Sequence, residues 1–421
     1  MRIAIVSDYI SKGGAAVACN RLSEALAVAG HEIRRFVLER GERPANWASG
    51  VTFAPEIIGR RLSALFELAS AFGCPNASRV CRIRSAERKL VDAISKWRPD
   101  VINVHNLHAF SSHFILVAGL AELAPLVWTL HDMWSFTGRC AYSGDCRQFE
   151  TGCTASCRTV NQYPSLSSRS VGVEWLKRKK FFAEFPQVAA VTPSRWLANE
   201  ALRGLWKNQV VEVIPNSLDL TIYRPIERAV ARAALGLPAT KRPHVLLAAD
   251  FLNESRKGGD MIGSALAACG KEFTLLTLGN YAPGSISENL HTVHLGYVKD
   301  ERMKALIFSA ADLLLHPAPT DNLPNTVIEA FACGTPAVAF KIGGLPEMVY
   351  EGITGWLSET VSATNLGKTL SGAIGGEFLE RGAIRAFAEE NYSLSGQAKA
   401  YEEFFQRLKN SRNIGHGLPC N

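Results

Sequence analysis

Two carboxylates beside an expected helix start are the residues of this chain best placed to do chemistry. Asp321 precedes Pro324, and Glu329 lies inside the helix-forming segment that ends at Gly334. Proline favours the beginning of a helix, and glycine favours its end. A helix that begins where a buried strand ends presents unpaired N–H groups, which bind phosphate. Because carboxylates accept hydrogen bonds from hydroxyl groups, the stretch suits a ligand with a diphosphate in its middle and sugar-like hydroxyls at both ends.

Two cations and two glycine pairs offer further places for a phosphate. Arg256 and Lys257 precede Gly258 at the start of another expected helix. Cations oppose the dipole at that end of a helix, a cost that makes sense if they bind an anion. Glycine lets backbone N–H groups come close to a ligand. Gly13-Gly14 and Gly343-Gly344 are candidates for this role, although a tight turn explains the first pair equally well.

Histidines lie at the ends of two expected strands. The runs Asp100–His108 and Leu126–Asp132 each contain a strand-like apolar segment and end in polar residues. Polar side chains at the carboxyl ends of parallel strands reach the crevice where ligands bind. A structural histidine with satisfied hydrogen bonds is the alternative. The candidates are His131, foremost, and then Asp132, His105 and His108.

Four cysteines fall within a stretch that is interspersed with glycine and serine. Such a loop buries little core, and a tetrahedral metal ion such as zinc could hold it. Free thiols or disulfides are the alternative, because the spacing lacks the Cys-x2-Cys pairs of a zinc knuckle. The candidate ligands are Cys140, Cys146, Cys153 and Cys157.

Alternating strand and helix patterns must position these residues. The first strand spans Ile3 to Ser7, a helix with one apolar face follows Gly14, and His31–Leu38 is the next expected strand. The same order begins again after a charged segment that contains prolines. We therefore predict an α/β protein with two doubly wound domains. The predicted divisions are an N-terminal domain at 1–220, a linker at 221–243, a C-terminal domain at 244–385 and terminal helices at 386–421.

The composition fits a globular protein with an anionic ligand or surface partner. The chain has 421 residues, of which 47% are hydrophobic and 20% charged, and a formal net charge of +7. This charge does not choose between a phosphorylated ligand, a membrane surface and nucleic acid. A strand at the first residues leaves no room for a signal peptide, so we expect a cytoplasmic protein. Basic helical stretches at 56–97 and 173–182 suit contact with anionic lipid, and solvated basic faces are the alternative.

Several of these motifs, taken in order, resemble the retaining glycosyltransferases of family 4. The Asn-Leu-Pro-Asn sequence at 322–325 is similar to their bacterial exopolysaccharide branch, of the colanic acid type. This chain has Asp321 where the family usually has a glutamate, a carboxylate that is one methylene shorter. The family's arginine five residues before the lysine is Leu252 here, so the resemblance assigns the guanidinium role to Arg256. The motifs are Gly13-Gly14, His131-Asp132, Pro215-Asn216, Arg256-Lys257-Gly258, Asp321 to Glu329 and Gly343-Gly344.

The resemblance implies the GT-B fold, with two facing Rossmann-like domains and a cleft between them. The N-terminal domain would bind the acceptor, the C-terminal domain would bind the nucleotide sugar, and the last helix would cross back to the first domain. The implied reaction moves a sugar from a nucleotide diphosphate sugar to a saccharide acceptor, lipid-linked in this branch, in exopolysaccharide or surface-glycan synthesis. The basic helical stretches add the expectation of a cytoplasmic protein at the inner face of the cell membrane.

The same resemblance assigns roles to the candidate residues. Asp321 would fix hydroxyls of the donor sugar, Glu329 the ribose, and His131 would contact the sugar near the acceptor. Fixed cations and helix N-termini would hold the leaving group, so no metal or other cofactor is expected for catalysis. Donor contacts are expected from Gly13, Gly14, Arg256, Lys257, Asn322, Leu323, Asn325, Thr326, Gly343 and Gly344, and acceptor-side contacts from Asp132, His105 and His108.

Two other classes of protein fit part of the sequence. A non-catalytic subunit of a polysaccharide assembly would bind a nucleotide sugar without transferring it. A zinc protein that binds nucleic acid would explain the charge and the cysteines, but not two strand-helix domains with matched phosphate sites. Nucleic acid is therefore not an expected partner. Similar Cys-rich loops in the resembling branch favour a structural role for zinc.

Overall fold

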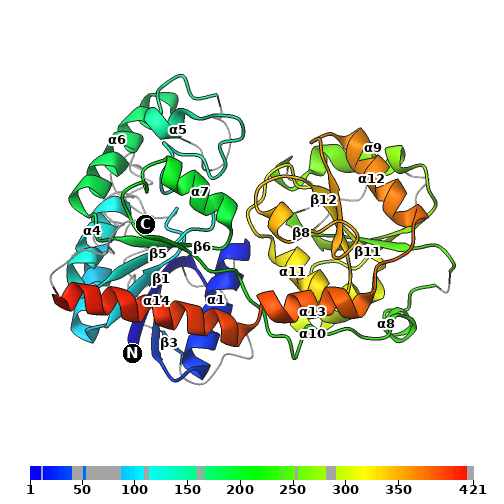
Figure 1. The fold of residues 1–421 in the computed structure, drawn as a ribbon, viewed down its shortest axis with the longest axis horizontal. Helices are drawn as coiled ribbons and strands as arrows, with labels where there is room; N and C mark the ends of the chain where they lie inside the picture. Colours follow the sequence, from blue (N-terminus) through cyan, green and yellow to red (C-terminus); the bar gives the residue numbers. More distant parts are fainter. Residues whose placement is uncertain are drawn as a thin grey trace, which may run out of the picture. The chain divides into compact units, whose positions relative to one another are not determined.

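The computed structural model describes residues 1–10, 13–39, 51–53, 87–108, 113–158, 164, 166–238, 240–251, 255–280 and 291–414. The chain divides into two compact units, Met1–Ile214 with Gln397–Asn421, and Pro215–Gly396. Each unit combines a parallel sheet with packed helices (Figure 1). This arrangement confirms the predicted pair of doubly wound α/β domains. The basic stretch predicted at 56–97 lies mostly outside the described residues, as does Leu252.

A parallel sheet forms the centre of the first unit. Its central strands β1, β4, β5 and β6 are rich in Val, Ile, Leu and Ala, because a strand covered on both faces is mostly apolar. The strand order is β3-β2-β1-β4-β5-β6-β7, so the winding reverses between β1 and β4. Ligand sites form at such a reversal, at the carboxyl ends of the strands. The strands are β1 Arg2–Tyr9, β2 Glu32–Glu39, β3 Val51–Phe53, β4 Val101–Val104, β5 Leu126–Thr129, β6 Ala189–Thr192 and β7 Val211–Val213.

Aromatic side chains fill much of the space between this sheet and its helices. Trp128 of β5 packs against Trp134 and Trp206, and Phe182 contacts Trp206 at 4.6 Å between ring centroids. Arg178 is buried with them, its guanidinium 4.8 Å from the centre of the Trp134 ring. Several residues that suited a lipid-facing surface therefore belong to the core. The helices are α1 Gly13–Val28, α4 His113–Leu123, α5 Gln148–Thr151, α6 Ser168–Glu184, α7 Arg195–Arg203 and α14 Leu394–Ile414.

The second unit repeats the architecture with the strand order β10-β9-β8-β11-β12-β13. Its winding reverses between β8 and β11, and each described pair of neighbouring strands is parallel. The strands are β8 His244–Phe251, β9 Thr274–Asn280, β10 Thr292–His294, β11 Leu313–His316, β12 Ala337–Phe340 and β13 Gly355–Ser358. The helices are α8 Arg228–Ala234, α9 Gly259–Cys269, α10 Glu301–Ala310, α11 Asn325–Ala332, α12 Ala363–Gly375 and α13 Arg381–Asn391, with short 3-10 turns at Ser255–Lys257 and Leu345–Glu347.

The units divide at positions that differ from the expected domain limits. Residues 221–243 do not form a free linker, because Tyr223 and Ala231 are buried in the core of the second unit. The first division falls after Ile214 rather than at residue 220. Helix α13 also stays with the second unit, where Ile384 and Tyr392 are buried. Only from Gln397 onward does the chain return to the first unit.

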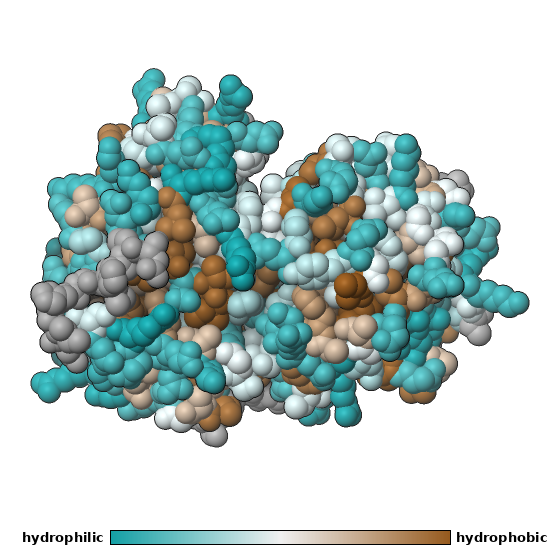
Figure 2. Space-filling model, viewed as in Figure 1, coloured by the Kyte–Doolittle hydropathy of each residue, from teal (hydrophilic) through white to brown (hydrophobic). Residues whose placement is uncertain are grey.

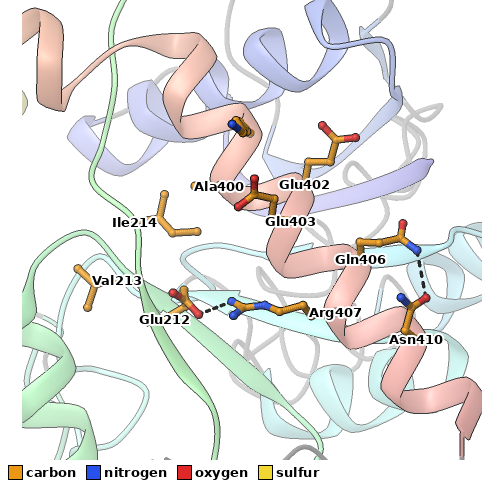
Figure 3. A pocket seen from close by; sticks show the side chains of 10 residues that line it. Glu212, Val213, Ile214, Ala400, Glu402, Glu403, Gln406, Arg407 and Asn410 are labelled. Atoms are coloured by element: carbon orange, nitrogen blue, oxygen red, sulfur yellow. Dashed lines mark hydrogen bonds and ion pairs between the residues drawn. The ribbon is translucent and has the colours of Figure 1, made fainter.

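Helix α14 completes the first unit (Figure 1) and lies beside the edge strand β7 (Figure 3). Lys409 pairs with Asp100 at 2.6 Å, and Arg407 reaches Glu212 of β7 (Figure 3). A groove of about 680 Å³ lies between α14 and β7. It is lined by Glu212, Val213, Ile214, Lys399, Ala400, Glu402, Glu403, Gln406, Arg407 and Asn410. None of the predicted site residues lines this groove.

Hydropathy varies over the drawn face of the molecule (Figure 2) and from one described helix to another. In the face drawn in Figure 2, hydrophobic residues form small separate groups among hydrophilic ones. Among the described helices, none is both long enough and apolar enough to cross a bilayer.

Candidate active site

Asp321 lies at the centre of a buried charged cluster in the second unit. Its Oδ2 atom is 3.0 Å from Lys257 Nζ and 3.3 Å from His316 Nε2, and its Oδ1 atom accepts a hydrogen bond from the backbone of Asn322 at 2.9 Å. Burial by itself raises the pKa of this carboxyl, but the charges of Lys257 and His316 bring it well below its ordinary value. The carboxylate is therefore ionised, and its charge is matched by fixed partners.

Lys257 is placed by a turn that only glycine can complete. Gly258, the cap of α9, has a φ of +86°, and a Cβ atom there would lie 2.2 Å from the carbonyl oxygen of Pro317. The turn before α9 thus packs directly on the loop after β11, which brings Lys257 to Asp321. Arg256, its neighbour in the same 3-10 turn, is partly exposed.

Gly343 joins the same cluster from the loop after β12. Its φ is +56°, and a Cβ atom would lie 1.9 Å from the carbonyl oxygen of Asp321. Asn216 donates to the carbonyl oxygen of Leu323 and to Asn325 Oδ1, both at 3.3 Å. The start of α11 is therefore held from two sides by segments far away in sequence.

Helix α11 begins at Asn325, with Pro324 as its N-terminal cap residue. This confirms the helix start that the proline indicated. The remaining predicted donor residues lie in or beside its first turns. Asn322, Leu323 and Glu329 are buried, Asn325 and Thr326 are half-buried, and Gly344 is buried next to Gly343.

The predicted histidines of the first unit meet in one hydrogen-bond network. His105 Nδ1 is 2.9 Å from His131 Nε2, and His105 Nε2 is 2.9 Å from Asn103 Oδ1. Burial lowers the pKa of His131 to about 4 and that of His105 well below its ordinary value. Both rings are therefore neutral at physiological pH, and they can donate or accept hydrogen bonds without carrying charge.

The second pair of predicted residues brings a histidine close to a carboxylate. His108 Nε2 lies 3.4 Å from Asp132 Oδ2, and Asp132 Oδ1 also accepts from the backbone of Trp134 at 2.8 Å. Burial lowers the pKa of His108, but the carboxylate of Asp132 more than offsets this and raises it above the ordinary value. His108, His131 and Asp132 line one small cavity at the ends of β4 and β5.

The glycine pair at the start of α1 is only partly described, because residues 11 and 12 lie outside the described ranges. Gly13 has a φ of +81°, a conformation that favours glycine, and Gly14 is exposed. A Cβ atom on Gly13 would meet nothing within 4 Å. The need for glycine here therefore comes from backbone conformation rather than from close packing.

The four clustered cysteines are free thiols in this structure. Burial and the neighbouring Cys140, Cys146 and Cys157 raise the pKa of Cys153 to about 11, and Gly138 donates a backbone hydrogen bond to its sulfur at 3.2 Å. Within the described part of the chain, no three His, Cys, Asp or Glu side chains are arranged to hold a metal ion. A zinc site on these thiols stays a prediction.

Three residues of these clusters were not among the candidates. His316, the last residue of β11, faces Asp321. Asn103 lies inside β4, and the sequence alone does not distinguish a functional asparagine there from a structural one. Tyr401, whose hydroxyl lies 3.0 Å from Thr129 Oγ1, comes from α14. The position of His316 at a strand end was a usable signal, whereas nothing local marks the other two.

Two family models match the chain. Residues 12–222 match the model described as Glycosyltransferase Family 4, and residues 242–374 match the model described as Glycosyl transferases group 1. The first match lies mostly in the first compact unit and the second lies in the second unit, and together they include Asp321, Lys257, the clustered histidines and the four cysteines. A relative in Escherichia coli (strain K12), the colanic acid biosynthesis glycosyl transferase WcaC, is 26% identical over 74% of this chain and 77% of its own length.

Solved structures share the fold at lower identity. Sucrose-phosphate synthase from Thermosynechococcus elongatus is 19% identical and superposes with a TM-score of 0.66 over 97% of this chain and 99% of its own. Anabaena Alr3699/HepE in complex with UDP-glucose is 17% identical, with a TM-score of 0.63 over 97% of this chain and all 100% of its own. The chain therefore belongs to the glycosyltransferases of family 4 and has their GT-B fold.

Proposed function

We propose that this glycosyltransferase moves a sugar from a nucleotide diphosphate sugar to a saccharide acceptor, with retention, in exopolysaccharide or surface-glycan synthesis. The observation that carries the proposal is the buried pair of Lys257 and Asp321 beside the start of α11. A cation, a helix N-terminus and a carboxylate together match a phosphate next to sugar hydroxyls. WcaC, named for colanic acid biosynthesis, and the HepE complex with UDP-glucose support this choice.

The charged cluster explains how the leaving group would be stabilised. As the bond from the anomeric carbon to the diphosphate breaks, negative charge develops on the phosphate oxygens. Lys257, Arg256 and the N–H groups at the start of α11 are positive groups fixed before the reaction begins. Preorganised charges of this kind lower the barrier because they need not reorient. A divalent ion is not required in this scheme.

The two carboxylates would orient the two ends of the donor. Asp321, ionised and held by its partners, would accept hydrogen bonds from hydroxyls of the donor sugar, and Glu329 would accept them from the ribose. His131 would contact the sugar near the acceptor. Retention would follow from attack on the face that the diphosphate leaves, with a phosphate oxygen taking the proton of the acceptor hydroxyl.

The proposal is tested by identifying a donor and then following its turnover. A ligand that binds only the folded protein raises the melting temperature, so nucleotide sugars can be screened by thermal shift. The stabilising donor is then incubated with candidate acceptors, and the anomeric configuration of the product is read by NMR. We expect a retained configuration. An inverted product would contradict the mechanism, and a donor that binds but is never transferred would favour a non-catalytic nucleotide-sugar-binding subunit.

We also propose that the acceptor is lipid-linked and that the protein works at the inner face of the cell membrane. Helices α4 and α6 pack together and carry three exposed apolar side chains. Ile115 is 70%, Val173 52% and Leu176 60% exposed. Lys177 and Lys180 on α6 are exposed as well, with 62% and 76% of their side chains accessible. Apolar residues beside lysines suit the headgroup layer of an anionic membrane.

Vesicle sedimentation tests this surface. The wild-type protein should sediment with vesicles that contain phosphatidylglycerol and remain in solution with pure phosphatidylcholine. Leu176→Ser should weaken the sedimentation, whereas Val28→Ser, at an 82% exposed position of α1, should not. Equal binding of both variants would show that this surface is not the contact.

A further inference from the structure

A chain of buried hydrogen bonds leads from β5 to His131, and the donor and acceptor of each bond can be assigned. Asn103 Nδ2 lies 3.1 Å from the carbonyl oxygen of Val127 and 2.9 Å from Thr129 Oγ1. A carbonyl oxygen can only accept, so this atom of Asn103 is the donating amide nitrogen. The other amide atom, Oδ1, is therefore an acceptor, and it faces His105.

The direction of the next bond follows from this assignment. Because Asn103 Oδ1 can only accept, the atom 2.9 Å away, His105 Nε2, must carry a proton. His105 is 2% exposed, and burial lowers its pKa well below the ordinary value. A neutral imidazole has one proton, so Nδ1 of His105 has none and accepts.

The last bond then fixes the proton on His131. His105 Nδ1 accepts at 2.9 Å from His131 Nε2, which therefore carries the single proton of that ring. We propose that Asn103 and His105 are positioning residues that hold His131 in the neutral Nε2–H form, in which the unprotonated Nδ1 is able to accept from a sugar hydroxyl. The consequence for sugar binding rests on the proposed transfer reaction, whereas the position of the proton does not.

The charged neighbours leave this arrangement in place. Asp132, which could attract a proton to His131, lies 3.4 Å from His108 and also accepts from the backbone of Trp134. His108, which is more basic than usual, repels a charge on His131 and contributes to its lowered pKa. The Asn103–His105 chain and the His108–Asp132 pair thus lie at the same edge of the sheet, with the pKa of His131 lowered and that of His108 raised.

NMR of protein labelled with ¹⁵N-histidine reads the proton directly, because protonated and bare ring nitrogens differ in chemical shift. His131→Gln and His105→Gln identify the two sets of signals. At pH 7 we expect a proton on Nε2 and none on Nδ1 in both rings. A proton on Nδ1 of His131, or a charged ring, would overturn the proposal.

Matched variants separate positioning from simple packing. His105→Asn keeps an acceptor close to the position of Nδ1, whereas His105→Leu removes it. We expect His105→Leu to give a mixture of His131 tautomers and to lower kcat about tenfold, the usual scale of one hydrogen bond, with the donor KM little changed. His105→Asn should retain the Nε2–H form and most of the kcat.

Tyr392→Phe is the control, because it removes the hydroxyl of another buried tyrosine, in the second unit, without touching the chain from Thr129 through Asn103 to His105. It should leave both the tautomer and kcat unchanged. A wild-type kcat in His105→Leu would refute the functional role while leaving the proposed reaction intact. A wild-type protein that transfers no sugar would refute the proposed function, and the NMR result would still decide the position of the proton.

Discussion

The two clusters of polar residues solve opposite electrostatic problems. Around Asp321, in the second unit, a buried carboxylate is ionised and matched by Lys257 and His316. Around His131, in the first unit, buried imidazoles are neutral. His131 is bonded to His105, His105 to the amide of Asn103, and that amide to the hydroxyl of Thr129. The cluster around Asp321 can counter a charge on a ligand, whereas the neutral imidazoles of His105 and His131 offer hydrogen bonds without charge.

This difference fits the division of labour expected of a nucleotide-sugar enzyme. A diphosphate would be matched by a fixed cation such as Lys257, which lies 3.0 Å from Asp321. A neutral sugar hydroxyl needs a donor or acceptor of fixed direction, which a neutral histidine supplies if its tautomer is set. A substitution in the cluster around Asp321 should therefore act through charge, and one in the cluster around His131 through geometry.

The largest effect should come from Lys257→Met. It leaves Asp321 buried without its main cation, which should lower the free energy of unfolding by about 3–5 kcal/mol. It should also reduce kcat/KM for the donor by about three orders of magnitude, because the diphosphate loses a fixed charge. Urea denaturation and initial rates measure the two effects.

The matched control for this variant is Lys341→Met. Lys341 also pairs with a carboxylate of the second unit, Glu359, at 2.7 Å, but the pair is exposed. Its loss should cost less than about 1 kcal/mol and leave the rate unchanged. Equal effects of the two substitutions would mean that the buried cluster has no special role.

Glu329→Ala should be the next largest change. Glu329 is 5% exposed inside α11, and the fold should survive its truncation. We expect kcat/KM to fall about 100-fold, since the two hydrogen bonds that the ribose hydroxyls would donate to the charged carboxylate would be lost. Circular dichroism checks the fold, and full activity in the folded variant would count against the assignment of the donor site.

Acid should act on the two clusters in different pH ranges. The folded-state pKa of His131, about 4, lies below its unfolded value of about 6.5. Between these values the unfolded chain binds more protons, so the free energy of unfolding falls as the pH falls. Asp321 also has a lowered folded-state pKa, so its stabilising contribution is present above about pH 4, its unfolded value, and is lost below.

Denaturation of His131→Gln and Asp321→Asn at several pH values separates the two ranges. As the pH falls from about 6.5 to about 4, the free energy of unfolding of His131→Gln should rise relative to that of the wild type. The cost of Asp321→Asn should be constant there and shrink only at lower pH. Parallel curves for both variants would remove the contrast between the clusters.

The smallest predicted effect concerns zinc at Cys140, Cys146, Cys153 and Cys157. We expect protein purified under reducing conditions to contain about one zinc ion per chain by elemental analysis, bound as thiolates. Cys140→Ser with Cys153→Ser should release it and lower the melting temperature, with little change in kcat. Cys269→Ser, at a buried thiol of the second unit, is the control. Metal-free wild-type protein would end this prediction.

Local signals predicted most of what can be recognised from a short stretch of chain. Pro324 and Gly334 indicated the two ends of α11, because proline and glycine each affect the backbone conformation at their own position. Polar residues at strand ends marked His105 and His131, since parallel strands bring their carboxyl ends to one edge. The pairing of β4 with β5 then made these two histidines neighbours.

Contacts between distant segments were not predictable in this way. The hydroxyl of Tyr401 reaches Thr129 from a helix 272 residues further along the chain. Arg178 reads as a solvated cation but is buried against aromatic rings. The boundary at Ile214 leaves Leu218 in the second unit, where it pairs with Ser393, and nothing near either residue signals that pairing. Such features are set by tertiary packing rather than by local sequence.

The central claim is that fixed cations and helix amides, rather than a divalent ion, hold the leaving diphosphate. The direct test is the rate of sugar transfer from the identified donor in EDTA, compared with the rate in added magnesium. The account predicts that the wild-type protein keeps most of its activity in EDTA. A rate that falls to background in EDTA and returns with magnesium would contradict it.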